Sequence, residues 1–391
     1  MTSTFGWLDT DESRRDAMLK IVELFKDEST VDDLGIGSIR DAISDALFPG
    51  TSVLHTRLRY ILFVPWLLAQ AAQAKNLEAM RAEFRRLEIR LIYSLLIGGE
   101  TEGVIGGVAK DALKRTPSAA YWASLRRYGT RAWNTSVDGF FRRAMTQKTL
   151  GRHSAEPDDP EAREALEAGL DPNLPEPPPD LLHSATFALP DHERRYLVDR
   201  LSMSTEGSLL AWLVHHPRTE EAAFVWELGP STLPPELENV VEQGRLFREV
   251  IRGAPLLYNL ILSERARNSE LEGNYRQELA TWREQVTDGP LRQWDGPHFW
   301  RTLQRAGSPI RQPTQIFVDA WVQHVDSTID LASSDSARTT IADRERRLKG
   351  GRSRLVNQAA LDRWNGAAGL VTLDYRWRVT RGLLLDLWET T

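Results

Sequence analysis

Apolar residues recur every three or four positions along most of the chain, which is the spacing of one face of an α-helix. One such stripe consists of Met80, Phe84, Leu87, Leu91 and Leu95. It ends at Gly98-Gly99, and a second stretch over residues 255–287 ends at Gly289-Pro290, where glycine and proline stop a helix. The chain is therefore predicted to be mainly α and multi-helical.

Two local predictions bear on the candidate sites: the start of one helix and the type of secondary structure near the C-terminus. A helix is expected to begin at Thr51 or Ser52 and to kink at Pro65, because serine and threonine cap helix starts and proline interrupts the hydrogen bonds of a helix. Strand-like alternation is clear in residues 371–379 alone, so a short β element near the C-terminus is an alternative to a terminal helix there.

Charge is concentrated in blocks that the total of −6 conceals. Residues 104–153 hold ten basic and two acidic side chains, whereas residues 1–50 hold five basic and eleven acidic ones. Residues 154–199 are again acidic, with twelve acidic against three basic side chains. Such blocks predict binding partners better than the net charge does.

The second acidic block is rich in proline and predicts a linker. Seven prolines lie between Pro157 and Pro179, and proline fixes the backbone while removing a hydrogen-bond donor. We therefore expect a helical N-terminal domain over 1–152 that contains the basic block, a linker over 153–180, and a helical C-terminal domain over 181–391.

Common catalytic and cofactor motifs are missing from the sequence. Without cysteine there is no thiol nucleophile and no zinc–cysteine site. The glycines of residues 98–107 lack the lysine and hydroxyl of a P-loop, and neither a His-Glu-x-x-His nor a Gly-x-Ser-x-Gly motif occurs. We expect no catalytic residues, metal or cofactor. With no signal peptide, and an apolar run at 60–72 too short to span a bilayer, the sequence predicts a cytoplasmic protein without a membrane partner.

The basic block contains a candidate DNA-binding motif. Residues 108–129 read as two short helices around a Thr-Pro-Ser turn, with Val108, Leu113 and Leu125 inward and Ser118 as an N-cap, which is typical of a helix-turn-helix. The residues expected to meet phosphates are Lys114, Arg115, Arg126 and Arg127. The alternative is a solvated basic face that docks against the acidic N-terminal block.

A second basic cluster lies near the C-terminus and includes Arg344, Arg346, Arg347, Lys349, Arg352 and Arg354. Trp364, Tyr375 and Trp377 follow, with Arg376 between the last two. Arginines beside aromatic rings suit the tracking and stacking of a nucleic acid, and Arg376 is included among the candidate contacts. The alternative is a set of core aromatic residues with arginines that reach past them to solvent.

A third cluster comprises Arg40, Arg57 and Arg59, which flank the expected helix start at Thr51 and Ser52. The N-terminal N–H groups of a helix can bind a phosphate, so these residues are candidate phosphate ligands. Plain helix capping, with Arg40 paired to Asp41 or Asp45, is the alternative.

Several motifs together resemble an uncharacterised bacterial domain-of-unknown-function family over essentially the whole chain. They lie at residues 5–9, 34–41, 47–52, 56–60, 63–66, 253–260 and 373–377. The resemblance supplies no catalytic residues. It implies a gene found near helicases and phospholipase-D-like nucleases in phage-defence loci.

These observations favour a non-catalytic nucleic-acid-binding accessory protein of an anti-phage defence or DNA-processing assembly, with DNA as the favoured ligand. A helicase or nuclease is the expected protein partner. Two alternatives stay open at this point: a protein-interaction scaffold of the same assembly, and a nuclease with an unrecognised site.

Overall fold

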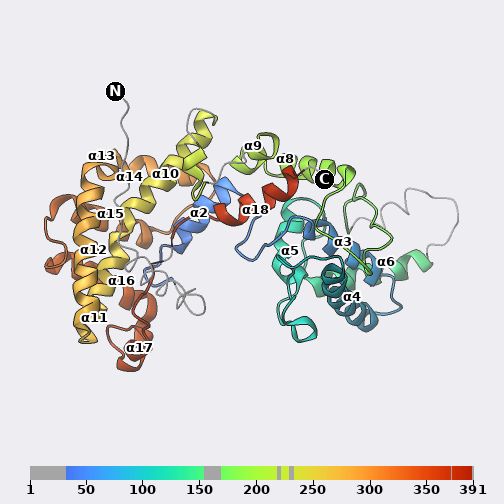
Figure 1. Ribbon diagram of the computed structural model, residues 1–391, viewed down its shortest axis with the longest axis horizontal. Coiled ribbons are helices and arrows are strands. Elements are labelled where there is room, and N and C mark those ends of the chain that lie inside the picture. Colours follow the sequence, from blue (N-terminus) through green and yellow to red (C-terminus); the bar gives the residue numbers. More distant parts are fainter. Residues whose placement is uncertain (1–31, 154–168, 218–221, 229–232, 371, 390–391) are drawn as a thin grey trace. The chain divides into compact units, whose positions relative to one another are not determined.

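The computed structural model describes residues 32–153, 169–217, 222–228, 233–370 and 372–389 (Figure 1). Within these ranges the backbone forms α-helices and short 3-10 helices, and it forms no strand longer than the isolated bridge between Arg131 and Leu170. The predicted mainly α class is confirmed. No helix in the described ranges has both the length and the apolar composition needed to cross a bilayer.

The chain divides into two compact units, each built from segments distant in sequence. Unit 1 comprises Met1–Ala42 and Glu242–Leu373, and unit 2 comprises Ile43–Val241 and Asp374–Thr391. The chain passes from one unit to the other within helix α2 (Gly37–Leu47), within α10 (Pro235–Ile251) and after Leu373. This division differs from the expected one, which placed the boundary in a linker over 153–180.

The described part of the proline-rich stretch is held by hydrogen bonds within unit 2. The α-helices that lie wholly in the described part of unit 2 are α3 (Tyr60–Ala71), α4 (Leu77–Ile97), α5 (Pro117–Arg127), α6 (Val137–His153), α8 (Asp191–Ser204), α9 (Leu209–His215) and α18 (Trp377–Trp388). The Trp66 indole of α3 donates a 2.6 Å hydrogen bond to the Pro175 carbonyl, and the Ser94 hydroxyl of α4 donates a 2.8 Å bond to the Leu181 carbonyl. Proline removes a donor but leaves a carbonyl acceptor, so the Pro175 bond anchors the stretch, and the Leu181 bond anchors the residue just after the expected linker.

The core of unit 2 is built around α3 and α4. Helix α3 buries ten of its twelve residues and is therefore apolar on all sides, as an internal helix is. Helix α4 begins at the N-cap Asn76, whose side chain accepts a hydrogen bond from the Ala79 N–H, and its apolar stripe is buried as predicted. Pro65 lies inside α3, but the helix begins at Tyr60 and not at Thr51 or Ser52.

Unit 1 is centred on a hairpin of two helices. Its described helices after α10 are α11 (Gly253–Arg265), α12 (Ser269–Asp288), α13 (Pro290–Gln293), α14 (Gly296–Arg305), α15 (Gln312–Ser327), α16 (Asp335–Lys349) and α17 (Gln358–Asp362). Helices α11 and α12 pack side by side (Figure 1). A Cβ atom at Gly253 would lie 2.1 Å from the Trp282 ring, so glycine is required for this close approach.

The expected short β element near the C-terminus is wrong for the described residues. Residues 372–374 have no regular structure, residues 375 and 376 form a turn, and α18 begins at Trp377. The Asp374 carboxylate accepts backbone hydrogen bonds from Arg376 and Arg378 at 3.1 and 3.4 Å, which caps the helix. Burial does alternate over Leu373, Tyr375 and Trp377, but a capped turn produces this alternation.

Candidate nucleic-acid interface

The candidate helix-turn-helix contains a single α-helix. Its expected first helix is a 3-10 turn of three residues, Lys110–Ala112, and Val108 is fully exposed instead of facing inward. Helix α5 follows with Thr116, not Ser118, as its N-cap and with Pro117 in its first turn. The Thr-Pro pair already satisfies the needs of a helix start, because threonine supplies a side-chain acceptor and proline needs no hydrogen-bond partner for its nitrogen.

The inner face of α5 is fixed by buried polar contacts. The Tyr121 hydroxyl accepts hydrogen bonds from the Thr56 and Arg57 N–H groups at 2.9 and 3.1 Å. The His55 ring stacks on Tyr121 with centroids 4.1 Å apart, and its Nε2 lies 2.9 Å from the Ser124 hydroxyl. Burial lowers the pKa of His55 to about 4, so the ring is neutral at pH 7. Both His55 and Ser124 are closed to solvent, so this pair serves packing.

The N-terminus of α5 is already occupied by a carboxylate of the protein. Glu88, on α4, accepts a 2.9 Å hydrogen bond from the Ser118 N–H. It is 2% exposed, and burial raises its pKa. A carboxylate at this position takes the place that a bound phosphate takes at other helix starts. Any anion therefore has to meet α5 along its outer face.

The outer face of α5 is smooth and bordered by cations. Ala119, Ala123, Arg126 and Arg127 are exposed and lie within about 100° of one another around the helix axis. Lys114 and Arg115, also exposed, precede the helix. Among the described residues, no carboxylate lies within ion-pair distance of these four cations.

The second basic cluster separates into structural and exposed members. The Arg344 guanidinium is buried in unit 1 and donates to the Leu34, Gly35 and Pro313 carbonyls at 2.8 to 3.1 Å. Gly35 has a φ of +68°, and a Cβ there would lie 2.5 Å from this guanidinium. Arg344 therefore holds the described N-terminal segment and is no ligand contact.

Lys349 and Arg354 both pair with Asp33. Arg354 lies 2.6 Å from the Asp33 carboxylate, and Lys349 binds the same oxygen. The neighbouring Glu345 is fully buried and accepts hydrogen bonds from the Tyr258 hydroxyl at 3.2 Å and from the Arg354 N–H at 2.9 Å. This group of residues, here called the Asp33 cluster, is internally satisfied. Within the described part of the chain, no three His, Asp or Glu side chains come together as metal ligands.

Three members of the second cluster do face solvent: Arg346, Arg347 and Arg352. Arg346 lies 3.6 Å from Asp343, a half-exposed ion pair of small energetic weight. Two of the three aromatic side chains expected to stack on bases are not accessible, because Tyr375 and Trp377 are each 1% exposed, whereas Trp364 is half-buried. Arg376 lies 2.6 Å from the Asp45 carboxylate and donates to the Thr51 carbonyl at 2.9 Å.

The third cluster consists of ion pairs. Arg59 binds both oxygens of Glu193 at 2.6 and 2.7 Å inside unit 2, and Arg57 lies 2.8 Å from Asp386. Arg40 pairs with the adjacent Asp41 at 2.9 Å. Because no helix begins at Thr51 or Ser52, the N–H groups expected to bind phosphate are not arranged for it.

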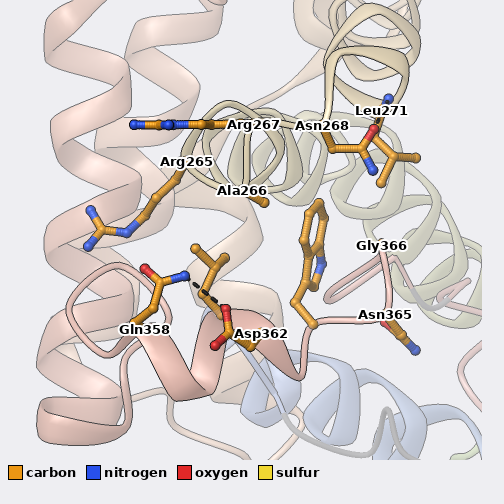
Figure 2. Close-up of a pocket in the computed structure, with 11 residues that line it drawn as sticks. Arg265, Ala266, Arg267, Asn268, Leu271, Gln358, Asp362, Asn365 and Gly366 are labelled. Atoms are coloured by element: carbon orange, nitrogen blue, oxygen red, sulfur yellow. Dashed lines mark hydrogen bonds between the residues drawn. The ribbon is translucent and has the colours of Figure 1, made fainter.

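Unit 1 also contains a pocket that the sequence did not indicate. It has a volume of about 680 Å³ and lies between the α11–α12 connection and the segment that includes α17. Its lining includes Arg265, Arg267, Gln358, Asp362 and Trp364 (Figure 2). Residues 358–366 fall just after the second basic cluster, and no local motif connects them with Arg265 or Arg267, about 100 positions earlier.

The whole chain matches one family model. The protein belongs to a family described as a family of unknown function (DUF6361), whose model covers residues 2–390. No curated protein and no solved structure matches the chain.

Proposed function

We propose that this protein binds duplex DNA without catalysing a reaction on it, and that it contacts the phosphate backbone with the outer face of α5. The observation that carries the proposal is the set of exposed cations at both ends of this face, Lys114 with Arg115 and Arg126 with Arg127, which have no carboxylate partners among the described residues. We further propose a role as an accessory of an antiviral or DNA-processing assembly, which follows from the genomic neighbourhood that the family resemblance implies.

The dimensions of α5 suit a duplex. Its 11 residues extend about 16 Å, over which duplex DNA carries about nine phosphate charges. Ala119 and Ala123 lie between the two cation pairs, and their small side chains let a sugar–phosphate backbone approach the helix closely. A duplex is favoured over a single strand, since two of the three rings expected to stack on bases, those of Tyr375 and Trp377, are buried.

The test is the salt dependence of binding by the full chain, measured by fluorescence anisotropy with a duplex oligonucleotide. Neutralisation of Lys114, Arg115, Arg126 and Arg127 to glutamine should reduce the slope of log K against log salt by about 3–4, because each phosphate contact releases close to one condensed counterion.

A matched control removes four exposed arginines of unit 1: Arg292, Arg301, Arg305 and Arg311. Both variants change the net charge by the same amount, so a general effect of charge would alter the two slopes equally. The proposal predicts that the control keeps the wild-type slope within about one unit. Absence of binding by wild-type protein at low salt would contradict it and favour the protein-interaction scaffold.

A further inference from the structure

The connection between α11 and α12 has a conformational feature at the rim of the unit 1 pocket. The Arg267 N–H donates to the Glu264 carbonyl at 3.1 Å, and the Asn268 N–H donates to the Ser263 carbonyl at 2.9 Å. This pair of bonds is a Schellman motif, which ends α11 and places Arg267 at the left-handed position with a φ of +55°. That position normally holds glycine, because a side chain is strained there.

Arg267 occupies a left-handed backbone position that normally holds glycine, and its side chain lines the pocket. The strained backbone lowers the stability of the fold, whereas the side chain adds a cation to the pocket lining. Arg265 and Arg267 both line the pocket, and Figure 2 shows their side chains leaving the end of α11 on the same side but at different angles. Both are exposed, and neither has a carboxylate partner among the described residues. Guanidinium binds phosphate through paired hydrogen bonds, so two arginines without carboxylate partners in one pocket lining favour a phosphate ligand.

The remaining lining offers a ring and several polar groups. Trp364 is half-buried, and its Nε1 donates to the Asn259 Oδ1 at 3.2 Å. Asn259 is fully buried and also accepts the Ala368 N–H at 2.7 Å, so the indole is held in place before any ligand arrives. On α17, the Gln358 amide donates to the Asp362 carboxylate at 2.8 Å, which leaves acceptor and donor capacity for the edge of a base.

From this geometry we propose that the pocket binds a free nucleoside phosphate. Its base stacks on Trp364, its phosphates lie against Arg265 and Arg267, and the polar groups of α17 contact the edge of the base. The volume of about 680 Å³ lies within the range of small-molecule sites. Asp362 carries a negative charge, but its hydrogen bond with Gln358 keeps it on the α17 wall, and the two arginines leave the lining net positive.

The decisive variant is Arg267→Gly, because the proposal predicts opposite changes in stability and in binding. Glycine relieves the strained backbone and should raise the Tm by about 2 °C. Loss of the guanidinium should weaken the binding of ADP by about tenfold or more, measured by isothermal titration calorimetry on the full chain. Arg363→Gln serves as the control, since Arg363 is exposed beside Trp364 but does not line the pocket, and it should leave the Kd within about twofold.

Ligand fragments and the ring provide independent tests. Adenosine and pyrophosphate should each bind more weakly than ADP, and a panel of ATP, GTP, CTP and UTP defines the base. Trp364→Leu should weaken binding about 5–150-fold, the loss of one base–aromatic stack, whereas Trp364→Phe keeps a ring and should retain most of the affinity. The proposal is overturned if no nucleotide of the panel binds saturably at millimolar concentration. Equal losses in Arg267→Gly and Arg363→Gln would also overturn it.

Discussion

Two basic segments that look alike in sequence have different structural roles. In residues 344–354 of unit 1, Arg344, Lys349 and Arg354 are used inside the fold, bound to carbonyl groups or to Asp33. Residues 114–127 of unit 2 keep all four of their cations on the surface. A high density of arginine and lysine in the sequence therefore does not by itself identify a binding surface. The two segments differ in whether a hydrogen-bond acceptor or carboxylate from a distant part of the sequence contacts the side chains.

The largest expected effect comes from breaking the Asp33 cluster. Asp33→Asn removes the charge that Lys349 and Arg354 share. It should lower the free energy of unfolding by about 3 kcal/mol, because both partly buried cations lose a short ion pair and Lys349 keeps only the 3.9 Å pair with Glu345. Urea denaturation measures this loss. Arg347→Gln, an exposed change in the same segment, is the control and should stay within about 0.5 kcal/mol of wild type. Similar values for both variants would show that the two kinds of cation do not differ.

A smaller effect concerns the inner face of α5 in unit 2. The pKa of His55 is about 4 in the folded chain because of burial, and its ordinary value is 6.5. Between these values the unfolded chain binds the additional proton, so His55 contributes stability that is complete above pH 6.5 and is lost as the pH falls.

From pH 7 to pH 5 this group should lower the free energy of unfolding by about 2 kcal/mol. The comparison is with His55→Gln, which lacks the titrating ring and should show a smaller decrease over the same interval. Urea denaturation at several pH values gives both curves. Parallel curves would exclude His55 as the source.

Thr116→Ala tests the start of α5 and should cost about 1 kcal/mol through loss of the N-cap. The outer face remains intact in this variant, so its salt-dependent DNA binding should be unchanged under conditions where the protein is folded. Thermal denaturation and anisotropy on the same sample separate the two properties. A reduced salt slope in Thr116→Ala would mean that the N-terminus of α5 takes part in the contact.

The smallest effect is expected from the four glutamine substitutions at residues 114, 115, 126 and 127. Exposed cations without partners contribute little to stability, so each change should alter the free energy of unfolding by under about 0.5 kcal/mol. Thermal denaturation of the purified variant checks this. A large loss would show that these side chains belong to the fold, as Arg344 does in unit 1.

The secondary structure that depends on residues close in sequence could be predicted from the sequence. The mainly α class and the stripe from Met80 to Leu95 follow from periodicity and are confirmed. Pro65 lies inside α3 as predicted. The start of this helix at Tyr60 is eight or nine residues later than predicted, because Thr51 donates to the Phe48 carbonyl and closes a turn instead of capping a helix. Local patterns identify element types well and decide their boundaries less well.

The sequence did not indicate contacts between distant segments. Arg59 meets Glu193, Arg57 meets Asp386 and Arg344 meets Leu34, and no spacing rule connects residues so far apart. The nucleotide pocket has the same character, because Arg267 and Trp364 come from segments about 100 residues apart. The DNA-binding role of α5 stays a prediction that rests on its exposed cations.

The pairing of Asp33 with Lys349 and Arg354 also has a consequence for biosynthesis. More than 300 residues separate the partners, so the N-terminal segment cannot find its native contacts until nearly the whole chain has left the ribosome. At about 5–20 residues per second this interval is roughly 15–60 s. In unit 2, the ion pair between Arg57 and Asp386 likewise forms only after almost the whole chain has been synthesised. A nascent chain halted before residue 349 should therefore be sensitive to protease at its N-terminal segment, long after that segment was translated.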